Sequence, residues 1–310
     1  MVTSKSSFPP VLLTGLVALG TDDVLVRAHS RHSAGPQSSL TALVRWTRRG
    51  PSRPIFVEKG VTSQCKALRD GDLSVALAFD GTLYSVGDDG VTIDKALPRD
   101  EEPNANLWMF SVRRIGDCLY ASGMLRRMYR RRTAGPWEQV GDGERMINPD
   151  ALETGFRDIA GWSDNDLTCV GLGGEIWWFD GSRWSQIDSP IAVRLDAALQ
   201  IDEKTVVACG VRGSVLRGHA HKWEVIRTLD GVGDLTSIEI FGGRTFLAGR
   251  SGIYELCRDE LRVVDLGLGR SISTGYLSAS GESMWSVGSS SVAVFDGSQW
   301  SEVPSPFRTL

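Results

Sequence analysis

The chain contains 310 residues, of which 41% are hydrophobic and 23% charged, and its formal net charge at pH 7 is −4. This balance is ordinary for a globular protein, and the negative charge disfavours general nucleic-acid binding, which requires basic side chains against several phosphates. No apolar run reaches the length of a membrane-spanning helix, so the sequence predicts no membrane association.

The N-terminal segment has two interpretations. Lys5 precedes the apolar stretch Val11–Leu19, and Ala18-Leu19-Gly20 could be a signal-peptide cleavage site. Two prolines at the start of the stretch argue against a signal peptide, and the same residues fit the first strand of the first repeat described below. We therefore expect a cytoplasmic protein, with export as the alternative.

A repeat of about 40 residues extends along the chain. The stretch V-G-L-G-G-E-I-W-W-F-D-G-S-R-W-S-Q-I-D-S-P at 170–190 returns near the C-terminus as V-G-S-S-S-V-A-V-F-D-G-S-Q-W-S-E-V-P-S-P at 287–306. The repeated glycine recurs every 39 residues, and the repeated tryptophan position recurs after 39, 38 and 39 residues, with Leu261 replacing one tryptophan. A fixed period of this kind indicates a repeat architecture.

Each repeat predicts four short strands. In the best copy we expect them at 155–162, 166–171, 175–179 and 184–187, with Asp180-Gly181-Ser182 as the last turn. Asp-Gly between two β-rich runs favours a hairpin, because glycine tolerates positive φ and aspartate bonds its own backbone. Four antiparallel strands in ~40 residues are typical of a β-propeller blade.

Seven such units account for nearly the whole chain. In the first, the expected strands are Val11–Leu19, Val24–His29, Leu40–Thr47 and Pro54–Glu58. We therefore predict an all-β fold, a single seven-bladed β-propeller domain over residues 1–310. The expected blades, in chain order, cover about 9–60, 61–98, 106–140, 154–190, 194–229, 234–267 and 271–306.

The repeated glycines and tryptophans have a structural explanation. The glycines end strands where backbones crowd together, and the tryptophans begin outer strands and should wedge between neighbouring blades. A buried aromatic side chain removes ~150–250 Å² from water, which gives an upper bound of about 4–6 kcal/mol per wedge. We expect these residues to be structural and not a ligand cage: Gly171, Gly210, Gly249, Gly288, Trp137, Trp184, Trp223 and Trp300.

Two copies of the outer hairpin carry a family resemblance. Phe179-Asp180-Gly181-Ser182-Arg183-Trp184 and Phe295-Asp296-Gly297-Ser298-Gln299-Trp300 resemble the Asp-box repeat of bacterial neuraminidases, although here glycine directly follows aspartate. The broader cadence V-G-x-x-G-x-I-x-x-F-D-G-x-x-W looks like non-catalytic propellers of the photosystem-assembly-factor type. The resemblance implies a folding motif remote from any active site. The likeness to WD40 propellers is architectural only.

The sequence offers little catalytic chemistry. No nucleophile elbow, zinc-protease helix or phosphate-binding loop occurs. His219 and His221 lie on one outer turn with no Cys, Asp or Glu beside them to complete a shell, so we predict no metal site and no cofactor. Five cysteines without close spacing should be reduced and mostly buried. The inner strands expected at 197–201, 236–240 and 274–278 carry few ionisable groups, which argues further against an axial active site.

Three insertions interrupt the repeat, at Ser30–Ser39, Pro98–Ala105 and Gly141–Glu153. Second-to-third-strand loops and blade-to-blade connections open on the same face of a propeller, so all three should emerge on one face over blades one to four. Solvated loops without a partner are one interpretation, and a binding face for a basic protein is the other. We call the acidic residues of the last two insertions the acidic rim: Asp100, Glu101, Glu102, Asp142, Glu144, Asp150 and Glu153.

The third blade contains a run of basic residues, Arg126-Arg127-Met128-Tyr129-Arg130-Arg131-Arg132. Strand alternation predicts that its odd-numbered and even-numbered residues face opposite sides. Nonspecific DNA binding takes roughly 6–10 phosphate contacts, more than one patch supplies. We therefore expect arginines that are solvated or paired with neighbouring carboxylates, and we call this set the basic patch: Arg126, Arg127, Tyr129, Arg130 and Arg131.

Together these features predict a non-catalytic binding protein that docks one macromolecule and is either a monomer or part of a 1:1 complex. The concrete hypothesis is an inhibitor or immunity protein that neutralises a cognate toxin or enzyme with a basic surface. One alternative is a propeller hydrolase or lyase acting on a sugar or lactone at the central axis. The other is an assembly factor or scaffold for a larger complex.

Overall fold

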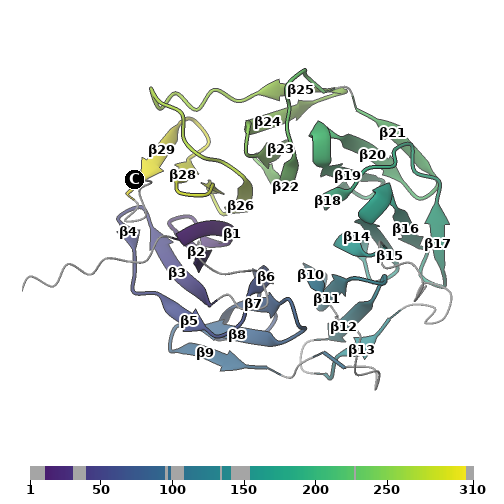
Figure 1. Cartoon of the computed structure of the whole chain (residues 1–310), viewed down its shortest axis with the longest axis horizontal. Helices are drawn as coiled ribbons and strands as arrows, with labels where there is room; N and C mark the ends of the chain where they lie inside the picture. The colour runs from purple at the N-terminus through teal and green to yellow at the C-terminus, as the bar shows by residue number, and fades with distance from the viewer. Residues whose placement is uncertain are drawn as a thin grey trace, which may run out of the picture.

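The computed structural model describes residues 11–30, 40–94, 97–98, 108–132, 135–140, 154–226 and 228–304. It shows seven antiparallel sheets arranged in a ring around a central axis, which confirms the predicted seven-bladed β-propeller (Figure 1). Each sheet comes from one continuous segment of chain, and the blades follow one another around the ring in chain order.

The first blade has five strands rather than the expected four, because two short strands both pair with its third strand. Its strands are β1 (Val11–Gly20), β2 (Asp23–Ser30), β3 (Thr41–Thr47), β4 (Gly50–Pro51) and β5 (Ile55–Val57).

The remaining six blades have four strands each, paired in simple meander order. Blades two to four contain β6 (Val61–Lys66), β7 (Asp72–Ala78), β8 (Leu83–Gly87), β9 (Gly90–Ile93), β10 (Met109–Ile115), β11 (Cys118–Gly123), β12 (Met128–Arg132), β13 (Glu138–Gln139), β14 (Phe156–Ser163), β15 (Asp166–Gly171), β16 (Ile176–Phe179) and β17 (Trp184–Ile187). Blades five to seven contain β18 (Leu195–Asp202), β19 (Thr205–Gly210), β20 (Val215–His219), β21 (Lys222–Val225), β22 (Leu235–Phe241), β23 (Arg244–Gly249), β24 (Gly252–Cys257), β25 (Glu260–Val263), β26 (Tyr276–Ser280), β27 (Ser283–Val287), β28 (Val292–Phe295) and β29 (Trp300–Val303).

Two 3₁₀ turns are the only helical elements among the described residues, and they follow the second strands of blades four and five. They are η2 (Leu172–Gly174) and η3 (Val211–Gly213). Within the described ranges, no helix has the length and apolar character needed to cross a membrane.

The hydrophobic core is divided into seven clusters, one at each junction between neighbouring blades. The second strands supply both of their faces to these clusters, since successive side chains of a strand point to opposite sides. In β19, Val206 and Ala208 pack toward blade four, whereas Val207 and Cys209 pack toward blade six. The repeated tryptophans Trp137, Trp184, Trp223 and Trp300 also lie in or against these inter-blade clusters.

The repeated glycines leave room for a backbone that passes very close. A Cβ at Gly171 would lie 1.9 Å from the carbonyl oxygen of Gly155, and one at Gly210 would lie 2.0 Å from that of Arg194. Gly249 and Gly288 show the same crowding against the segment that enters their inner strands. The backbone of these glycines is extended, so the 39-residue glycine period records a steric requirement rather than a special backbone conformation.

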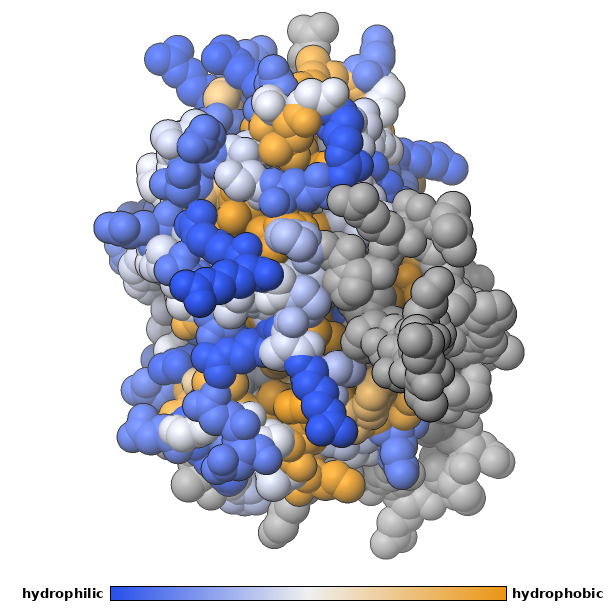
Figure 2. All heavy atoms as spheres, turned by 90° about the vertical axis from the view of Figure 1, so that its left-hand side faces the viewer, coloured by the Kyte–Doolittle hydropathy of each residue, from blue (hydrophilic) through white to orange (hydrophobic). Residues whose placement is uncertain are grey.

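The ring closes where the first blade meets the seventh. Ala18 N donates to Ser278 Oγ at 2.9 Å, and Leu13 N donates to the Ser289 carbonyl at 3.1 Å. Trp46 is fully buried in the cluster at this junction. Figure 2 views the ring from this side and shows hydrophilic side chains projecting from the surface, with hydrophobic groups set between them.

Candidate binding surfaces and axial cavity

One face of the ring carries both the second-to-third-strand turns and the blade connections. Met124, in such a turn of blade three, forms a β-bridge with Gly155, at the entry to blade four. In blade five, Val211 N likewise donates to the Arg194 carbonyl at 3.1 Å. We call this the connection face.

The acidic rim lies outside the described residues: Asp100, Glu101, Glu102, Asp142, Glu144, Asp150 and Glu153. The described residues that border its two segments include Pro98, Trp108, Val140 and Thr154. These residues belong to the connections between blades two and three and between blades three and four. The role of the rim therefore stays a prediction.

The basic patch is tied into the fold by interactions with its neighbours. Arg126 Nε lies 2.6 Å from Glu175 Oε2 of blade four, and its guanidinium lies over the Trp177 ring at 5.1 Å. Arg130 pairs with Glu138 at 3.2 Å. The positive charges of Arg126 and Arg130 are therefore balanced by carboxylates of the protein itself.

The other residues of the basic patch are buried and face blade two. Tyr129 is 1% exposed and lies in the cluster between blades two and three. Arg131 is 3% exposed, forms an ion pair with Asp94 of blade two and lies over the Trp137 ring at 5.1 Å. Arg127 is 5% exposed. The arrangement agrees with the expected pairing of these arginines, and it leaves little of the patch exposed for phosphate contacts.

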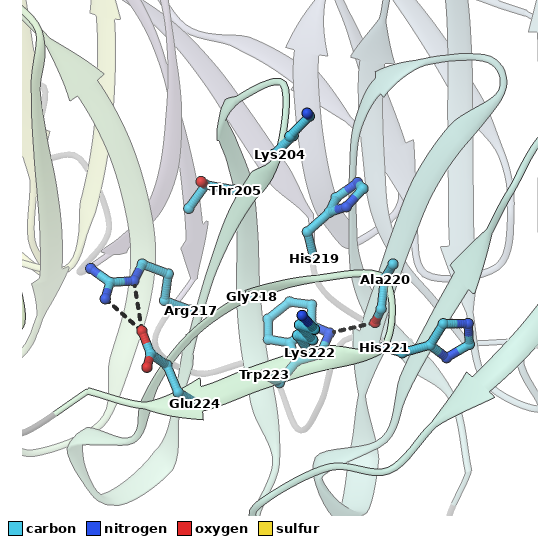
Figure 3. A pocket seen from close by; sticks show the side chains of 10 residues that line it. All are labelled: Lys204, Thr205, Arg217, Gly218, His219, Ala220, His221, Lys222, Trp223 and Glu224. Atoms are coloured by element: carbon cyan, nitrogen blue, oxygen red, sulfur yellow. Dashed lines mark hydrogen bonds and ion pairs between the residues drawn. The ribbon is translucent and has the colours of Figure 1, made fainter.

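A shallow groove of about 880 Å³ lies on the outer edge of blade five (Figure 3). Its floor is Trp223, whose Nε1 donates to the Ala220 carbonyl at 3.0 Å. Gly218 allows this packing, because a Cβ there would lie 2.6 Å from the Trp223 ring. The repeat pattern predicted Trp223 only as a wedge between blades, and its place in this groove was not predicted. The lining residues are Lys204, Thr205, Arg217, Gly218, His219, Ala220, His221, Lys222, Trp223 and Glu224.

The groove is predominantly basic. Arg217 is neutralised by Glu224 and Asp259 at 2.5 and 2.6 Å. Lys204 and Lys222 have no ion pair within the described part of the chain. Such a surface suits an acidic segment of a partner better than a basic one.

His219 and His221 do not form a metal site. His219 Nε2 lies 2.9 Å from Asp166 Oδ2, and both imidazoles pack edge-on against Trp178 of blade four. Across the described ranges, no three His, Cys, Asp or Glu side chains come together in a way that could hold a metal ion. The two histidines therefore serve to join blades four and five.

All five cysteines are free thiols; four are buried and Cys257 is partly exposed.

A cavity of about 170 Å³ lies on the central axis, and all seven innermost strands contribute to its wall. In six of them a β-bulge interrupts the register near the start of the strand. A bulge re-aims a side chain, and five of the six bulged residues line the cavity: Thr62, Phe110, Arg157, Asp196 and Thr236. Because inner strands begin at the connection face, the cavity lies toward that face.

The expectation that the axis carries few ionisable groups was wrong. It was based on β18, β22 and β26, whereas β10 and β14 contribute Arg113, Arg157 and Asp158. Even β22 contributes Glu239, whose carboxylate accepts the Ala279 N–H at 3.2 Å, and burial raises its pKa to about 7. These groups were missed because three of them lie on β10 and β14, Asp196 lies just before the stretch of β18 that was considered, and Arg27 comes from β2, a second strand.

The two aspartates of the cavity are already fully engaged. Asp158 accepts two bonds from the Arg113 guanidinium at 2.8 and 2.5 Å, one from Ser111 Oγ at 2.7 Å and one from Ala198 N at 3.0 Å. The adjacent charge of Asp158 raises the pKa of Arg113. Asp196 pairs with Arg157 at 3.1 Å and Arg194 at 2.9 Å. Both carboxylates are therefore engaged in ion pairs within the ring.

Comparison with known proteins supplies the remaining observation. Over 223 residues the chain is 30% identical to "Immune protein Tsi7" of Pseudomonas aeruginosa, a match that covers 72% of this chain and 73% of that protein. The chain belongs to the Tsi7 family. The prediction of an immunity protein is thereby confirmed, and a protein partner is consistent with it.

Solved structures resemble this Tsi7-family protein in fold alone. The WD40 β-propeller domain of Doa1 has a TM-score of 0.67 at 12% identity, with 91% of each chain covered. Sqt1 from Chaetomium thermophilum, solved bound to the N-terminus of the ribosomal protein L10, has a TM-score of 0.62 at 11% identity and covers 94% of this chain and 86% of its own. No family model matches the chain, and the Asp-box resemblance has no support beyond the turns themselves.

Proposed function

We propose that this protein neutralises a cognate toxin by binding it in a stoichiometric complex, without catalysis. The observation that carries the proposal is the 30% identity to an immune protein over 72% of the chain. The ion pairs of Asp158 and Asp196 support the non-catalytic part, because they commit the two carboxylates of the cavity wall to contacts within the ring. A rigid ring with side-chain packing at every blade junction suits a preorganised docking platform.

For the docking surface we propose the acidic rim, and hence a partner with a basic surface. Its two segments start and end on the connection face, on a frame of packed blades. Clustered charges of one sign accelerate encounter with an oppositely charged partner and exclude partners of like charge. The basic groove of blade five is the competing surface, and it would select an acidic segment instead.

The experiment compares neutralisation by four versions of the protein, each co-produced in bacteria with a candidate toxin from the same genome. The rim variant carries Asp100→Ser, Glu101→Ser, Glu102→Ser, Asp142→Ser and Glu144→Ser, and the groove variant carries Lys204→Ser and Lys222→Ser. A matched control changes exposed acidic residues in first-to-second-strand turns on the opposite face: Asp117→Ser, Glu203→Ser and Glu282→Ser.

Growth protection should persist in the wild type, the groove variant and the control, and should be lost in the rim variant. Purified complexes should show the same order of affinity, with a rim contribution that weakens as salt rises. Loss of protection in the groove variant alone would show that the toxin binds the groove of blade five and not the acidic rim. Protection that no version provides would contradict the proposed function itself.

A further inference from the structure

One cationic side chain at the axis has no anion beside it. Arg27 lies on β2, the second strand of its blade, and is 6% exposed. Its Nε donates to Thr14 Oγ1 at 3.1 Å and its Nη2 to the Thr14 carbonyl at 2.5 Å. No carboxylate among the described residues pairs with it. Buried charges are normally paired, because desolvation strongly disfavours an isolated ion.

The first blade is built to bring this guanidinium to the axis. A Cβ at Gly15 would lie 2.5 Å from Arg27 Nη2 and 2.9 Å from Cζ, so a side chain at this position would displace the guanidinium from the place it now occupies. The β-bulge between Leu13 and Gly15 then presents Thr14 to the guanidinium. Both Gly15 and Arg27 line the axial cavity.

The cavity wall carries an excess of positive charge. Arg27, Arg113 and Arg157 line it, against two carboxylates, Asp158 and Asp196. Asp196 is also shared with Arg194. The side chains of Arg113 and Arg157 remain 39% and 32% exposed, so solvent and small ions reach the wall.

The burial of Arg27 without an anion has a measurable cost. Desolvation lowers the pKa of its guanidinium to about 10, only partly offset by the nearby Tyr276 hydroxyl. At roughly 30 Å³ per water, 170 Å³ holds a small ion with part of its hydration shell. The cavity beside Arg27 therefore has room for an anion that would balance its charge.

We infer that the axial cavity is a binding site for one small oxyanion of the phosphate or carboxylate class, with Arg27 as its principal ligand. A guanidinium donates two parallel bonds to such an anion, a geometry that chloride cannot match. The guanidiniums of Arg113 and Arg157, which line the same wall, supply further N–H donors. The bound anion links blade one to the strands opposite and stabilises the ring.

The test measures the thermal unfolding midpoint with inorganic phosphate, or with acetate, replacing chloride at constant ionic strength and pH 7.5. The wild type should show a saturable rise of roughly 4–6 °C at 100 times the dissociation constant. Arg27→Gln should abolish the rise. Arg45→Gln, on the same blade but paired with Asp23 and Asp88, should retain it.

A second measurement uses the wild type alone, in case Arg27→Gln does not fold. Crystals soaked in tungstate should show an anomalous peak among Arg27, Arg113 and Arg157. A response to acetate alone would narrow the class to carboxylates, and one to phosphate alone to tetrahedral oxyanions. The inference is overturned by an equal response in Arg27→Gln, or by a wild type that shows neither a saturable response to either anion nor the peak at the axis.

Discussion

Individual residues in this protein are constrained mainly by how closely neighbouring backbones approach. The repeated glycines illustrate this, because the atoms that a Cβ would meet are backbone atoms of a paired strand, which cannot rotate away as a side chain could. At Gly210 the nearest are Arg194 O at 2.0 Å and Leu195 Cα at 2.7 Å. By contrast, Gly20 has open space around its Cβ position.

Gly210→Ala should therefore lower the free energy of unfolding by about 3 kcal/mol, since the two strands must separate to admit the methyl group. Urea denaturation gives the value. Gly20→Ala is the matched control and should change stability by less than about 0.5 kcal/mol. Equal effects of the two substitutions would show that crowding is not the reason for the glycine period.

His29 should make stability fall on acidification. Burial, followed by the charge of Arg27, lowers its folded-state pKa from 6.5 to about 4, although a backbone hydrogen bond to Val61 opposes the shift. Between pH 6.5 and pH 4 the unfolded chain therefore takes up a proton that the folded protein does not. Above pH 6.5 His29 is neutral in both states and does not reduce stability. As the pH falls from 6.5 to 4, this one proton lowers the free energy of unfolding by about 3 kcal/mol.

The measurement is the free energy of unfolding of the wild type and His29→Leu across this pH range. Between pH 6.5 and pH 4, the free energy of unfolding of His29→Leu should fall less steeply with pH than that of the wild type, by the contribution of one proton. Parallel curves for the two proteins would contradict the assignment.

At the scale of strands, the arginine-rich β12 shows how charge is used inside the ring. Each of its arginines meets a carboxylate from a different element: Arg130 pairs with Glu138 on β13, Arg131 with Asp94 after β9, and Arg132 with Asp164 after β14. Arg131 and Asp94 are both largely buried. Such a pair contributes most when it is intact and becomes costly when one member is removed.

Arg131→Met should cost about 3–5 kcal/mol of stability, because it removes the cationic half of a largely buried ion pair with Asp94. Adding Asp94→Asn should restore a large part of the loss. Arg183→Met, at an exposed pair with Asp180, serves as control and should cost less than about 1 kcal/mol. A double variant no more stable than the single one would show that Arg131 acts through packing on Trp137 instead.

The blades were predictable because their signals are local, whereas the charged sites were not. Asp180 accepts the N–H groups of Ser182 and Arg183 within its own turn, so the Asp-Gly signature is legible in the sequence. The entry of Arg27 into the axis depends on a missing Cβ at Gly15 and on a bulge in another strand. The partners of β12 likewise come from other segments of the chain, which only the packed ring brings together.

At the scale of the whole molecule, the ring is closed by side-chain packing and a few hydrogen bonds between the first and last blades. Trp46 joins the two by donating from Nε1 to the Pro304 carbonyl at 3.2 Å. Among the described residues, the first blade contains only strands from the N-terminal end and the seventh only strands from the C-terminal end, so neither sheet is completed by a strand from the other end. The closed ring holds the connection face in one geometry, which is what a preformed surface for a toxin requires.

The central claim is stoichiometric neutralisation, and the most direct test is a titration of the purified toxin. Toxin activity is measured at a fixed concentration far above the dissociation constant while this protein is added. Stoichiometric binding predicts that toxin activity falls linearly to zero at one equivalent. Inactivation of many toxin molecules by each molecule of this protein would show catalysis, and undiminished activity at excess would show that the two do not bind.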